Sequence, residues 1–522
     1  MILLIFFIIL MFVIILFIYN STPKKMNESM KIITPSKHNN KKIVIIGGGW
    51  AGISAAYLLS KNKNFEVIII EKEDKIGGQA SSSFRKSCNV EYSWRVYFDL
   101  YHCVKKILKD ANLLGKLCQI NPTIITDNKN SLPIDKIFDN KNIYQILKYY
   151  DVDNMTIIKL LYLLTLPQNI LEKFYNNTCF VEYLNNYDIF KLLAGPVLGF
   201  DPKKVCIPTV LNLTRNKLSS KTLGYKDYHV TCGPPNDELF NYLSDYLKSN
   251  KITILLNTEC FEINKIYNEK ILVKTNCGNI ECDEVIISSS LYSLTKLMAK
   301  FKNKDLNKKL YELKSCLQNY FSMNLYLSEE LGPNHNYIIL KEPWQPIIET
   351  KRQKLWKSYI KKYCNPKIKD VWNVDVFDFY PGHNGKILRD CSIKEVINET
   401  MNQIKNDKYI SSLRSKAGKS INDLILGQEI HNFWKEKNGK IYTTNPKFSI
   451  NMNAYENLLD YNYKSIGHNI WFAAYYCKPS FRFGASMDNS SFIGLNCGKL
   501  IYEKYGISIP NDIDDVLKKY NN

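Results

Sequence analysis

Residues 42–79, KIVIIGGGWAGISAAYLLSKNKNFEVIIIEKEDKIGGQ, decide the fold. The apolar and mostly β-branched run 43–46 predicts a buried parallel strand, and glycines follow it at once. Apolar residues then recur at helical spacing over 53–59, which predicts a helix. A second apolar run, 65–70, predicts another strand that ends on Glu71. The order of strand, turn, helix and strand is that of a nucleotide-binding βαβ unit.

Gly47, Gly49 and Gly52 form a GxGxxG pattern inside that unit. Such a turn must let the backbone approach a pyrophosphate, let the helix pack on the strand, and leave the N–H groups of the helix N-terminus facing the anion. Glycine alone removes the side chain that would block all three. We predict that these glycines, with Trp50 and Ala51 in the first helical turn, bind a dinucleotide.

Glu71 stands where an acid is expected at the end of the second strand. A carboxylate at this position accepts hydrogen bonds from ribose hydroxyls. We therefore predict Glu71 and the adjacent Lys72 as cofactor-binding residues. The alternative is a glycine-rich loop in an unrelated α/β protein, which the complete strand, helix and strand context disfavours.

The segment DKIGGQ, 74–79, indicates which dinucleotide is bound. It resembles the signature of FAD flavoproteins in the amine oxidase and phytoene desaturase superfamily, which ends in Arg-x-Gly-Gly-Arg. Here Lys75 and Gln79 stand in place of the two arginines. Neither side chain has the planar guanidinium group with which arginine binds phosphate through two hydrogen bonds. The sequence therefore predicts a lower affinity for the pyrophosphate. The resemblance implies FAD as cofactor, with further contacts from Gly77, Gly78, Gln79 and Ala80.

Residues 232–263 resemble a second part of the same superfamily. The resemblance implies a turn at Gly233, then a helix that buries Leu239, Leu243 and Leu247. It also implies a following strand in which Cys260 lies at the adenine. The alternative for this segment is an ordinary helix and strand without ligand contact.

Residues 470–501 resemble the last part of the FAD site. Tyr475 replaces the acid that ends the corresponding strand in the superfamily, and Asp488 is a secondary candidate for an acid. Ser486 is the expected N-cap of a helix that begins near Met487. The resemblance implies that this helix directs its N-terminus at the flavin, where it stabilises negative charge on reduction. We predict Tyr475, Ser486 and Met487 as cofactor-binding residues.

The chain has 522 residues and 45% hydrophobic residues, which fits two or three globular domains. Its formal charge of +20 accompanies a general excess of lysine and asparagine, and no nucleic-acid motif accompanies it, so no nucleic-acid partner is expected. The 14 cysteines form no CxxC pair, which predicts reduced, mostly buried thiols and no metal site.

Residues 1–20 carry no charged side chain and are long enough, as a helix, to cross the hydrocarbon core of a bilayer. They predict a single-pass membrane anchor. Lysines are abundant on its C-terminal side, so the catalytic part is expected to face the cytosol. A cleaved signal peptide is the alternative, but the segment lacks a basic start and a small-residue cleavage pattern.

The predicted fold is α/β: a Rossmann-like FAD-binding domain of the two-dinucleotide-binding-domain type, interleaved with an α+β substrate domain and preceded by a transmembrane helix. The predicted segments are a transmembrane anchor at 1–19, a linker at 20–40, FAD-binding parts at 41–95, 226–300 and 441–522, a helical substrate or membrane-facing region at 96–225, and a substrate domain at 301–440.

These features predict an FAD-dependent oxidoreductase that removes two electrons from a small apolar substrate of isoprenoid or sterol type. An amine oxidase on the same fold is one alternative, and a scaffold without turnover, with or without bound flavin, is another. No side chain is assigned as catalytic, because the flavin supplies the chemistry. Tyr475 and Tyr476 are expected to line the substrate cavity.

Overall fold

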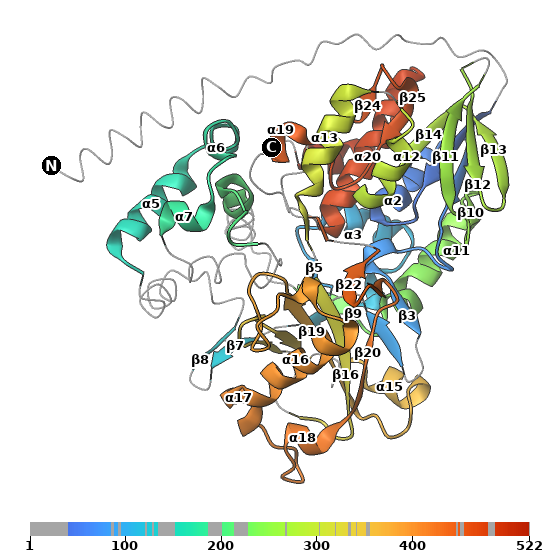
Figure 1. Ribbon diagram of the computed structural model, residues 1–522. Coiled ribbons are helices and arrows are strands. Elements are labelled where there is room, and N and C mark those ends of the chain that lie inside the picture. Colours follow the sequence, from blue (N-terminus) through green and yellow to red (C-terminus); the bar gives the residue numbers. More distant parts are fainter. Residues whose placement is uncertain are drawn as a thin grey trace.

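The computed structural model describes residues 40–520, apart from 85–87, 92–94, 121–122, 128–129, 134–151, 186–200, 213–227, 267–268, 302, 319, 332–335, 341, 351–354, 445–446, 449–453 and 479–485. Within this range the chain forms two main bodies, each built on its own sheet, and a smaller helical lobe (Figure 1).

The first body contains a six-stranded sheet whose strands come from three separated stretches of the chain. All neighbours pair in parallel except the edge strand β24. The central strands β1, β2 and β14 are largely buried, which explains why their sequences are mostly apolar runs. The spatial order is β10 (Thr253–Leu255), β2 (Phe65–Ile70), β1 (Lys41–Ile46), β14 (Glu284–Ile287), β25 (Gly467–Phe472) and β24 (Asn462–Tyr463).

Helices α2 (Trp50–Leu59) and α20 (Met487–Lys504) pack directly against each other on this sheet (Figure 1). A Cβ atom at Gly494 would lie 2.1 Å from the carbonyl oxygen of Ala51, so the backbones touch there. Farther along both helices, the hydroxyl of Tyr502 donates to the carbonyl oxygen of Leu58 at 3.1 Å. The two helices therefore run in the same direction and present their N-termini to the same edge of the sheet.

Other elements complete the first body. A three-stranded antiparallel sheet consists of β11 (Cys260–Lys265), β12 (Ile271–Thr275) and β13 (Gly278–Cys282). The surrounding helices are η1 (Gly78–Ala80), α3 (His102–Asp110), η4 (Asn236–Phe240), α11 (Asn241–Ser249), α12 (Leu291–Met298), α13 (Lys304–Lys314), α19 (Ala454–Asn457) and α21 (Asn511–Lys518).

The second body is built on a seven-stranded sheet, whose inner face packs a separate hydrophobic core. Its order is β20 (Ile425–Ile430), β16 (Tyr320–Leu327), β19 (Asp370–Phe377), β18 (Ile347–Glu349), β17 (Asn336–Ile339), β7 (Thr123–Asp127) and β8 (Asn130–Pro133). Its helices are α15 (Lys357–Tyr363), η5 (Leu388–Asp390), α16 (Ile393–Asn406), α17 (Lys408–Ser412) and α18 (Ile421–Leu424).

Short ladders lie outside these two sheets. They are β5 (Tyr97–Phe98), β9 (Tyr228–Thr231) and β6 (Leu117–Ile120) in one sheet, with the pairs β3 (Ser82–Phe84) and β4 (Asn89–Glu91), β15 (Leu317–Gln318) and β23 (Lys447–Phe448), and β21 (Trp434–Lys437) and β22 (Lys440–Thr443).

The segment 96–225 is less uniformly helical than its periodicity predicts. Strands β7 and β8 from this segment extend the sheet of the second body through parallel pairing of β7 with β17. The leucine-rich part of this segment forms a lobe of three helices, in which Leu160 and Leu163 are buried and Leu161 is 53% exposed. These helices are α5 (Asn154–Thr165), α6 (Gln168–Tyr175) and α7 (Phe180–Leu184), preceded in the chain by η2 (Leu114–Lys116).

The predicted membrane anchor requires a correction. Among the helices of the described part of the chain, none combines the length and apolar character that crossing a bilayer requires. Residues 1–39, which include the predicted anchor at 1–19, lie outside the described residues. Hydropathy alone suggested the span, whereas a crossing needs a continuous helix that satisfies its own backbone. The transmembrane helix and the single-pass, cytosol-facing location are therefore withdrawn.

The prediction of reduced cysteines is also wrong for two pairs. Cys88 is bonded to Cys364 with their Cα atoms 4.7 Å apart, and Cys118 to Cys232 with Cα atoms 5.5 Å apart. Their sequence separations of 276 and 114 residues give no local spacing pattern, which is why the sequence did not reveal them. Disulfides persist in oxidising surroundings, so these pairs also count against the predicted cytosolic setting.

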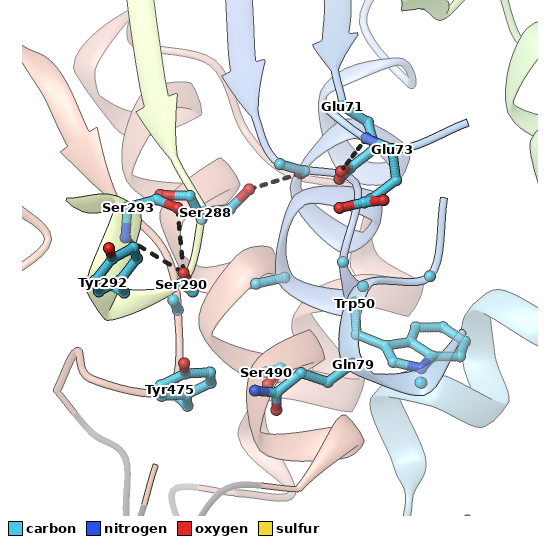
Figure 2. A pocket seen from close by; sticks show the side chains of 18 of the residues that line it. Trp50, Glu71, Glu73, Gln79, Ser288, Ser290, Tyr292, Ser293, Tyr475 and Ser490 are labelled. Atoms are coloured by element: carbon cyan, nitrogen blue, oxygen red, sulfur yellow. Dashed lines mark hydrogen bonds between the residues drawn. The ribbon is translucent and has the colours of Figure 1, made fainter. Parts of the chain in front are cut away.

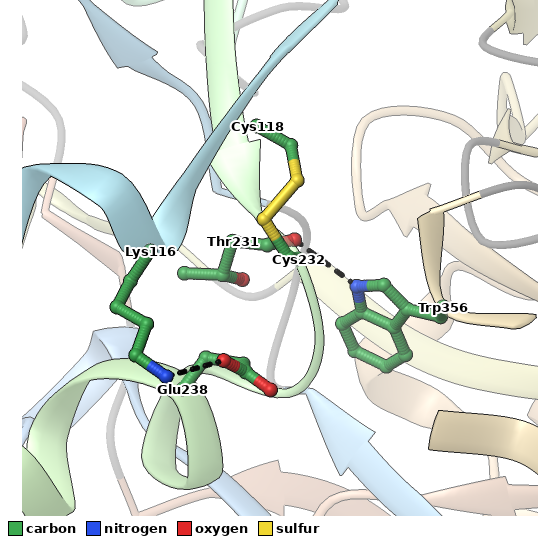
Figure 3. Close-up of a disulfide and its surroundings, with 6 residues drawn as sticks. All are labelled: Lys116, Cys118, Thr231, Cys232, Glu238 and Trp356. Carbon is green, nitrogen blue, oxygen red and sulfur yellow. Dashed lines mark hydrogen bonds and ion pairs between the residues drawn. A yellow bond between two sulfur atoms is a disulfide. The ribbon is translucent and has the colours of Figure 1, made fainter. Parts of the chain in front are cut away.

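Figure 3 shows that the Cys118–Cys232 disulfide ties strand β6 to the turn that follows β9. The indole nitrogen of Trp356, from the second body, donates to the carbonyl oxygen of Thr231 at 3.2 Å. The disulfide thus braces the small sheet on which the two bodies meet.

We expect the double substitution Cys118→Ser and Cys232→Ser to lower the free energy of unfolding by about 2–4 kcal/mol, because the cross-link closes a long loop in the unfolded chain. Urea denaturation of the oxidised proteins measures this difference. The matched control is Cys277→Ser, which removes an exposed free thiol. Equal midpoints for the double variant and the wild type would contradict a stabilising role for this disulfide.

Candidate functional site

A cavity of about 640 Å³ opens at the carboxyl ends of β1, β2, β14 and β25, between the two bodies (Figure 2). In a parallel α/β sheet this edge is where ligands bind. The structure brings almost all the predicted cofactor-binding residues together here. Those that line the cavity are Gly47, Gly49, Trp50, Ala51, Glu71, Lys72, Gly77, Gly78, Gln79, Ala80, Cys260, Tyr475, Ser486 and Met487.

Gly52 is the predicted residue that does not line the cavity, and its role is in packing. A Cβ atom at Gly52 would lie 2.0 Å from the carbonyl oxygen of Gly47 and 2.6 Å from the Ser288 hydroxyl. Helix α2 can therefore start directly beside strand β1 only with glycine at this position. Gly49 is the N-cap of α2 and has no side chain that could accept a hydrogen bond from the first turn. The backbone N–H groups at the start of α2 therefore face the cavity without a capping side chain.

Glu71 is buried at the end of β2. Its carboxylate accepts hydrogen bonds from the backbone N–H groups of Gly48 at 2.7 Å and Glu73 at 3.0 Å. Burial raises the pKa of Glu71, and these two backbone bonds act in the opposite direction. The carboxylate thus links the glycine turn to the loop after β2, at the end of the cavity that Cys260 also lines.

The second glycine pair crosses the N-terminus of α2. The N–H of Gly77 donates to the carbonyl oxygen of Gly48 at 2.8 Å, and a Cβ atom at Gly78 would lie 3.1 Å from the Cα atom of Gly49. Gly77 has φ +120°, a conformation that favours glycine. Gln79 follows directly and faces the cavity (Figure 2).

The N-terminus of α20 forms the opposite wall. As predicted, Ser486 is its N-cap and accepts a hydrogen bond from the N–H of Asn489 at 3.1 Å. Tyr101 also lines this wall, and burial raises the pKa of its hydroxyl. Tyr475 lies at the wall, where burial raises its pKa as well.

Two other candidates, Tyr476 and Asp488, lie elsewhere. The hydroxyl of Tyr476 donates to the carbonyl oxygen of Ser289 at 3.0 Å, and Tyr476 does not line the cavity. Asp488 is fully buried and accepts a hydrogen bond from the N–H of Val104 at 3.0 Å. Asp488 therefore joins α20 to α3 rather than to a ligand.

The sequence did not point to several lining residues. Arg95 reaches the cavity just before β5, and its guanidinium donates to the carbonyl oxygen of Gln79. The second body supplies a wall that carries one carboxylate among aromatic rings: Asp375, Phe377, Phe433, Tyr442 and Thr444. No local motif marks these residues, because they meet the glycine loop only through tertiary packing. The tryptophans of the same region, Trp344, Trp372 and Trp434, are buried in the core instead.

Comparisons with known proteins agree with this architecture. Residues 45–111 match the family described as the NAD(P)-binding Rossmann-like domain. No curated protein matches the sequence. Similar solved structures include a protein assigned as a protoporphyrinogen oxidase from Exiguobacterium sp. 255-15, at 14% identity and TM-score 0.58 over 90% of this chain and 100% of that one.

Two amine oxidases are also similar. Putrescine oxidase bound to putrescine has 12% identity and TM-score 0.59, over 89% of this chain and 99% of that one. Cyclohexylamine oxidase from Brevibacterium oxydans has 12% identity and TM-score 0.57, over 90% and 100%. The Rossmann-like α/β fold is thereby established, and the predicted resemblance to the amine oxidase type of fold is confirmed. At such identities the reaction must be argued from the site.

Proposed function

We propose that this protein is an FAD-dependent oxidoreductase that removes two electrons from a small, largely apolar substrate. The observation that carries the proposal is one continuous cavity. Its lining runs from Glu71, past the glycine turn and the α20 N-terminus, to the aromatic wall of the second body. In this proposal the dinucleotide and the substrate occupy neighbouring parts of the same cavity.

The residues present fit FAD. The main chain of the turn is bare because side chains are excluded at Gly52 and Gly78, where a Cβ atom would lie 2.0 Å and 3.1 Å from backbone atoms. The helix N-terminus capped by Gly49 offers N–H groups to a pyrophosphate. Glu71 would hold the adenosine ribose through its carboxylate. The N-terminus of α20, with Ser486, Met487 and Ser490 at the cavity, favours negative charge at the opposite end.

A bound flavin accepts a hydride or two electrons from the substrate. The protein's own groups have other tasks. Phe377, Phe433 and Tyr442 would give the substrate an apolar surface. Tyr101 would offer its hydroxyl as a hydrogen-bond donor at the α20 wall. The aromatic surface is the support for an apolar substrate of isoprenoid or sterol type.

Amine oxidation is the second candidate, and Asp375 favours it. This residue lies in β19, is 3% exposed and lines the cavity beside Phe377. A carboxylate among aromatic rings suits a substrate that carries an ammonium group on an apolar body.

One preparation tests the proposal. The full-length chain is purified with excess FAD, and retention of the yellow flavin after gel filtration is expected. Bleaching on anaerobic addition of an isoprenoid or an amine then identifies the substrate class. A colourless protein would remove the enzyme assignment in favour of a flavin-free scaffold, and a yellow protein that no substrate bleaches would favour a flavin-binding scaffold.

Substitution Asp375→Asn separates the two candidate substrates. If an amine is the substrate, we expect KM for the amine to rise on the order of a hundredfold, because the ammonium loses its buried counter-charge. For a neutral isoprenoid, kcat and KM should stay near wild type. Asp378→Asn is the matched control, since Asp378 is a nearby buried acid that does not line the cavity. An equal effect of both substitutions would contradict an ammonium contact at Asp375.

A further inference from the structure

Neither motif position that carries arginine in the FAD superfamily provides a guanidinium here. The ammonium of Lys75 lies 3.6 Å from the carboxylate of Asp74, and Lys75 does not line the cavity. Gln79 lines the cavity but is neutral. A pyrophosphate at the glycine turn therefore needs its counter-charge from elsewhere in the chain.

Arg95 brings a guanidinium to this loop from outside the motif. Its Nη2 donates to the carbonyl oxygen of Gln79 at 2.5 Å. Gln79 directly follows Gly78, whose position against Gly49 sets this loop over the N-terminus of α2. The guanidinium is thus held close to the bare helix end. A guanidinium matches the planar, two-pronged geometry that binds phosphate oxygens.

Trp50 supplies an independent sign that a ligand belongs at the same place. It is the first residue of α2, is 4% exposed and lines the cavity. Its Nε1 is buried, and among the residues that the structure describes it has no hydrogen-bond partner. Its ring packs edge-on against Phe240, at a centroid distance of 5.6 Å, so the indole is fixed. A buried N–H without an acceptor is costly, and a ligand oxygen would remove that cost.

We propose that the guanidinium of Arg95 and Nε1 of Trp50 together bind the pyrophosphate of the dinucleotide, in place of the two motif arginines. This inference rests on the proposed function, since it takes FAD as the ligand. The other cations at the cavity have different contacts. Lys72 lies 3.6 Å from the carboxylate of Glu73, and the Lys296 ammonium lies 4.3 Å from the ring centroid of Tyr292.

The fold explains how Arg95 reaches this position. Arg95 precedes strand β5, which pairs with β9, and β9 pairs in turn with β6. The Cys118–Cys232 disulfide fastens β6 to the end of β9 (Figure 3). The charge that binds the pyrophosphate is therefore carried by the small braced sheet, not by the Rossmann loop.

The test measures binding rather than turnover. Calorimetry on the apoprotein of the full chain gives affinities for FAD, for ADP, which contains the pyrophosphate, and for riboflavin, which does not. For Arg95→Gln we expect FAD and ADP to bind on the order of tenfold to a hundredfold more weakly, with riboflavin unchanged. The dependence of ADP affinity on salt should also become shallower, because one ionic contact is lost.

Two further variants and a control test the same contact if Arg95→Gln does not fold. Arg95→Lys retains the charge without the fork, so an intermediate loss of ADP affinity is expected. Trp50→Phe retains the ring against Phe240 and removes only the donor, and should weaken FAD and ADP by up to about tenfold. Lys75→Gln is the matched control and should leave all three affinities unchanged.

Several outcomes would overturn the inference. Unchanged ADP affinity in Arg95→Gln and in Trp50→Phe would exclude a pyrophosphate contact, and so would weaker binding of riboflavin alone. If Lys75→Gln lost as much ADP affinity as Arg95→Gln, the pyrophosphate contact would have to be assigned to Lys75 at the motif position. If the wild type binds neither FAD nor ADP, the proposed function itself fails, which is a separate result.

Discussion

Substitution Gly52→Ala is expected to weaken FAD binding about a hundredfold or more, although it adds a single methyl group. The new Cβ atom would lie 2.0 Å from the carbonyl oxygen of Gly47 and 2.6 Å from the Ser288 hydroxyl. The first contact is with main chain, which no side-chain rotation can relieve. Helix α2 must therefore move away from strand β1, and its N-terminus leaves the cavity.

Overpacking of this kind costs about 3 kcal/mol or more when backbone must shift, which corresponds to about a hundredfold loss of affinity. Equilibrium titration with FAD measures the loss, and urea denaturation shows how much of the cost falls on folding. The matched control is Gly115→Ala, because a Cβ atom there meets no atom within 4 Å. Wild-type FAD affinity in Gly52→Ala would show that the turn does not form the cofactor cradle.

Substitution Glu71→Gln is expected to weaken FAD binding as well. The two carboxylate oxygens accept from the N–H groups of Gly48 at 2.7 Å and Glu73 at 3.0 Å. An amide has one acceptor oxygen, so its NH2 group must face either a backbone donor or the ribose. We expect FAD affinity to fall about tenfold to a hundredfold, since a hydrogen bond to a charged group contributes about 1.5–3 kcal/mol.

The ligand series locates the effect of Glu71→Gln. FAD and adenosine diphosphate should both lose affinity, because they carry the adenosine ribose, whereas FMN should keep its affinity. If FMN binding fell as much as FAD binding, Glu71 would be acting on the turn as a whole and not on the ribose. Glu66→Gln is the matched control, since Glu66 is the exposed acid of the same strand.

Glu71 also predicts a dependence of stability on pH. Burial raises the pKa of this carboxyl in the folded protein above the ordinary value of 4.5. The folded state therefore binds the proton more tightly than the unfolded state, so the stabilising contribution of protonated Glu71 is lost as pH rises from 4.5 through the folded pKa. Glu71→Gln should remove this component, which urea denaturation at a series of pH values measures against wild type.

The sequence by itself determined the cofactor end of the site. Gly47, Gly49, Gly52 and Glu71 are separated by fewer than about thirty residues, and a βαβ unit fixes such positions through local geometry. The N-cap Ser486 and the start of α20 were predictable for the same reason, because a cap is a contact between near neighbours. The membrane span was the exception, since hydropathy describes a segment without its structure.

Only the tertiary structure decided the rest. Arg95 meets Gln79 through a small sheet closed by a disulfide between residues 114 positions apart, and Asp375 reaches the cavity from the sheet of the second body. Pairings at such separations leave no periodicity in the chain, because the local sequence around Arg95 or Asp375 is equally compatible with a surface position and with a ligand site. Packing of the two bodies against each other places Arg95 and Asp375 in the lining of the same cavity. That packing is a property of the whole fold.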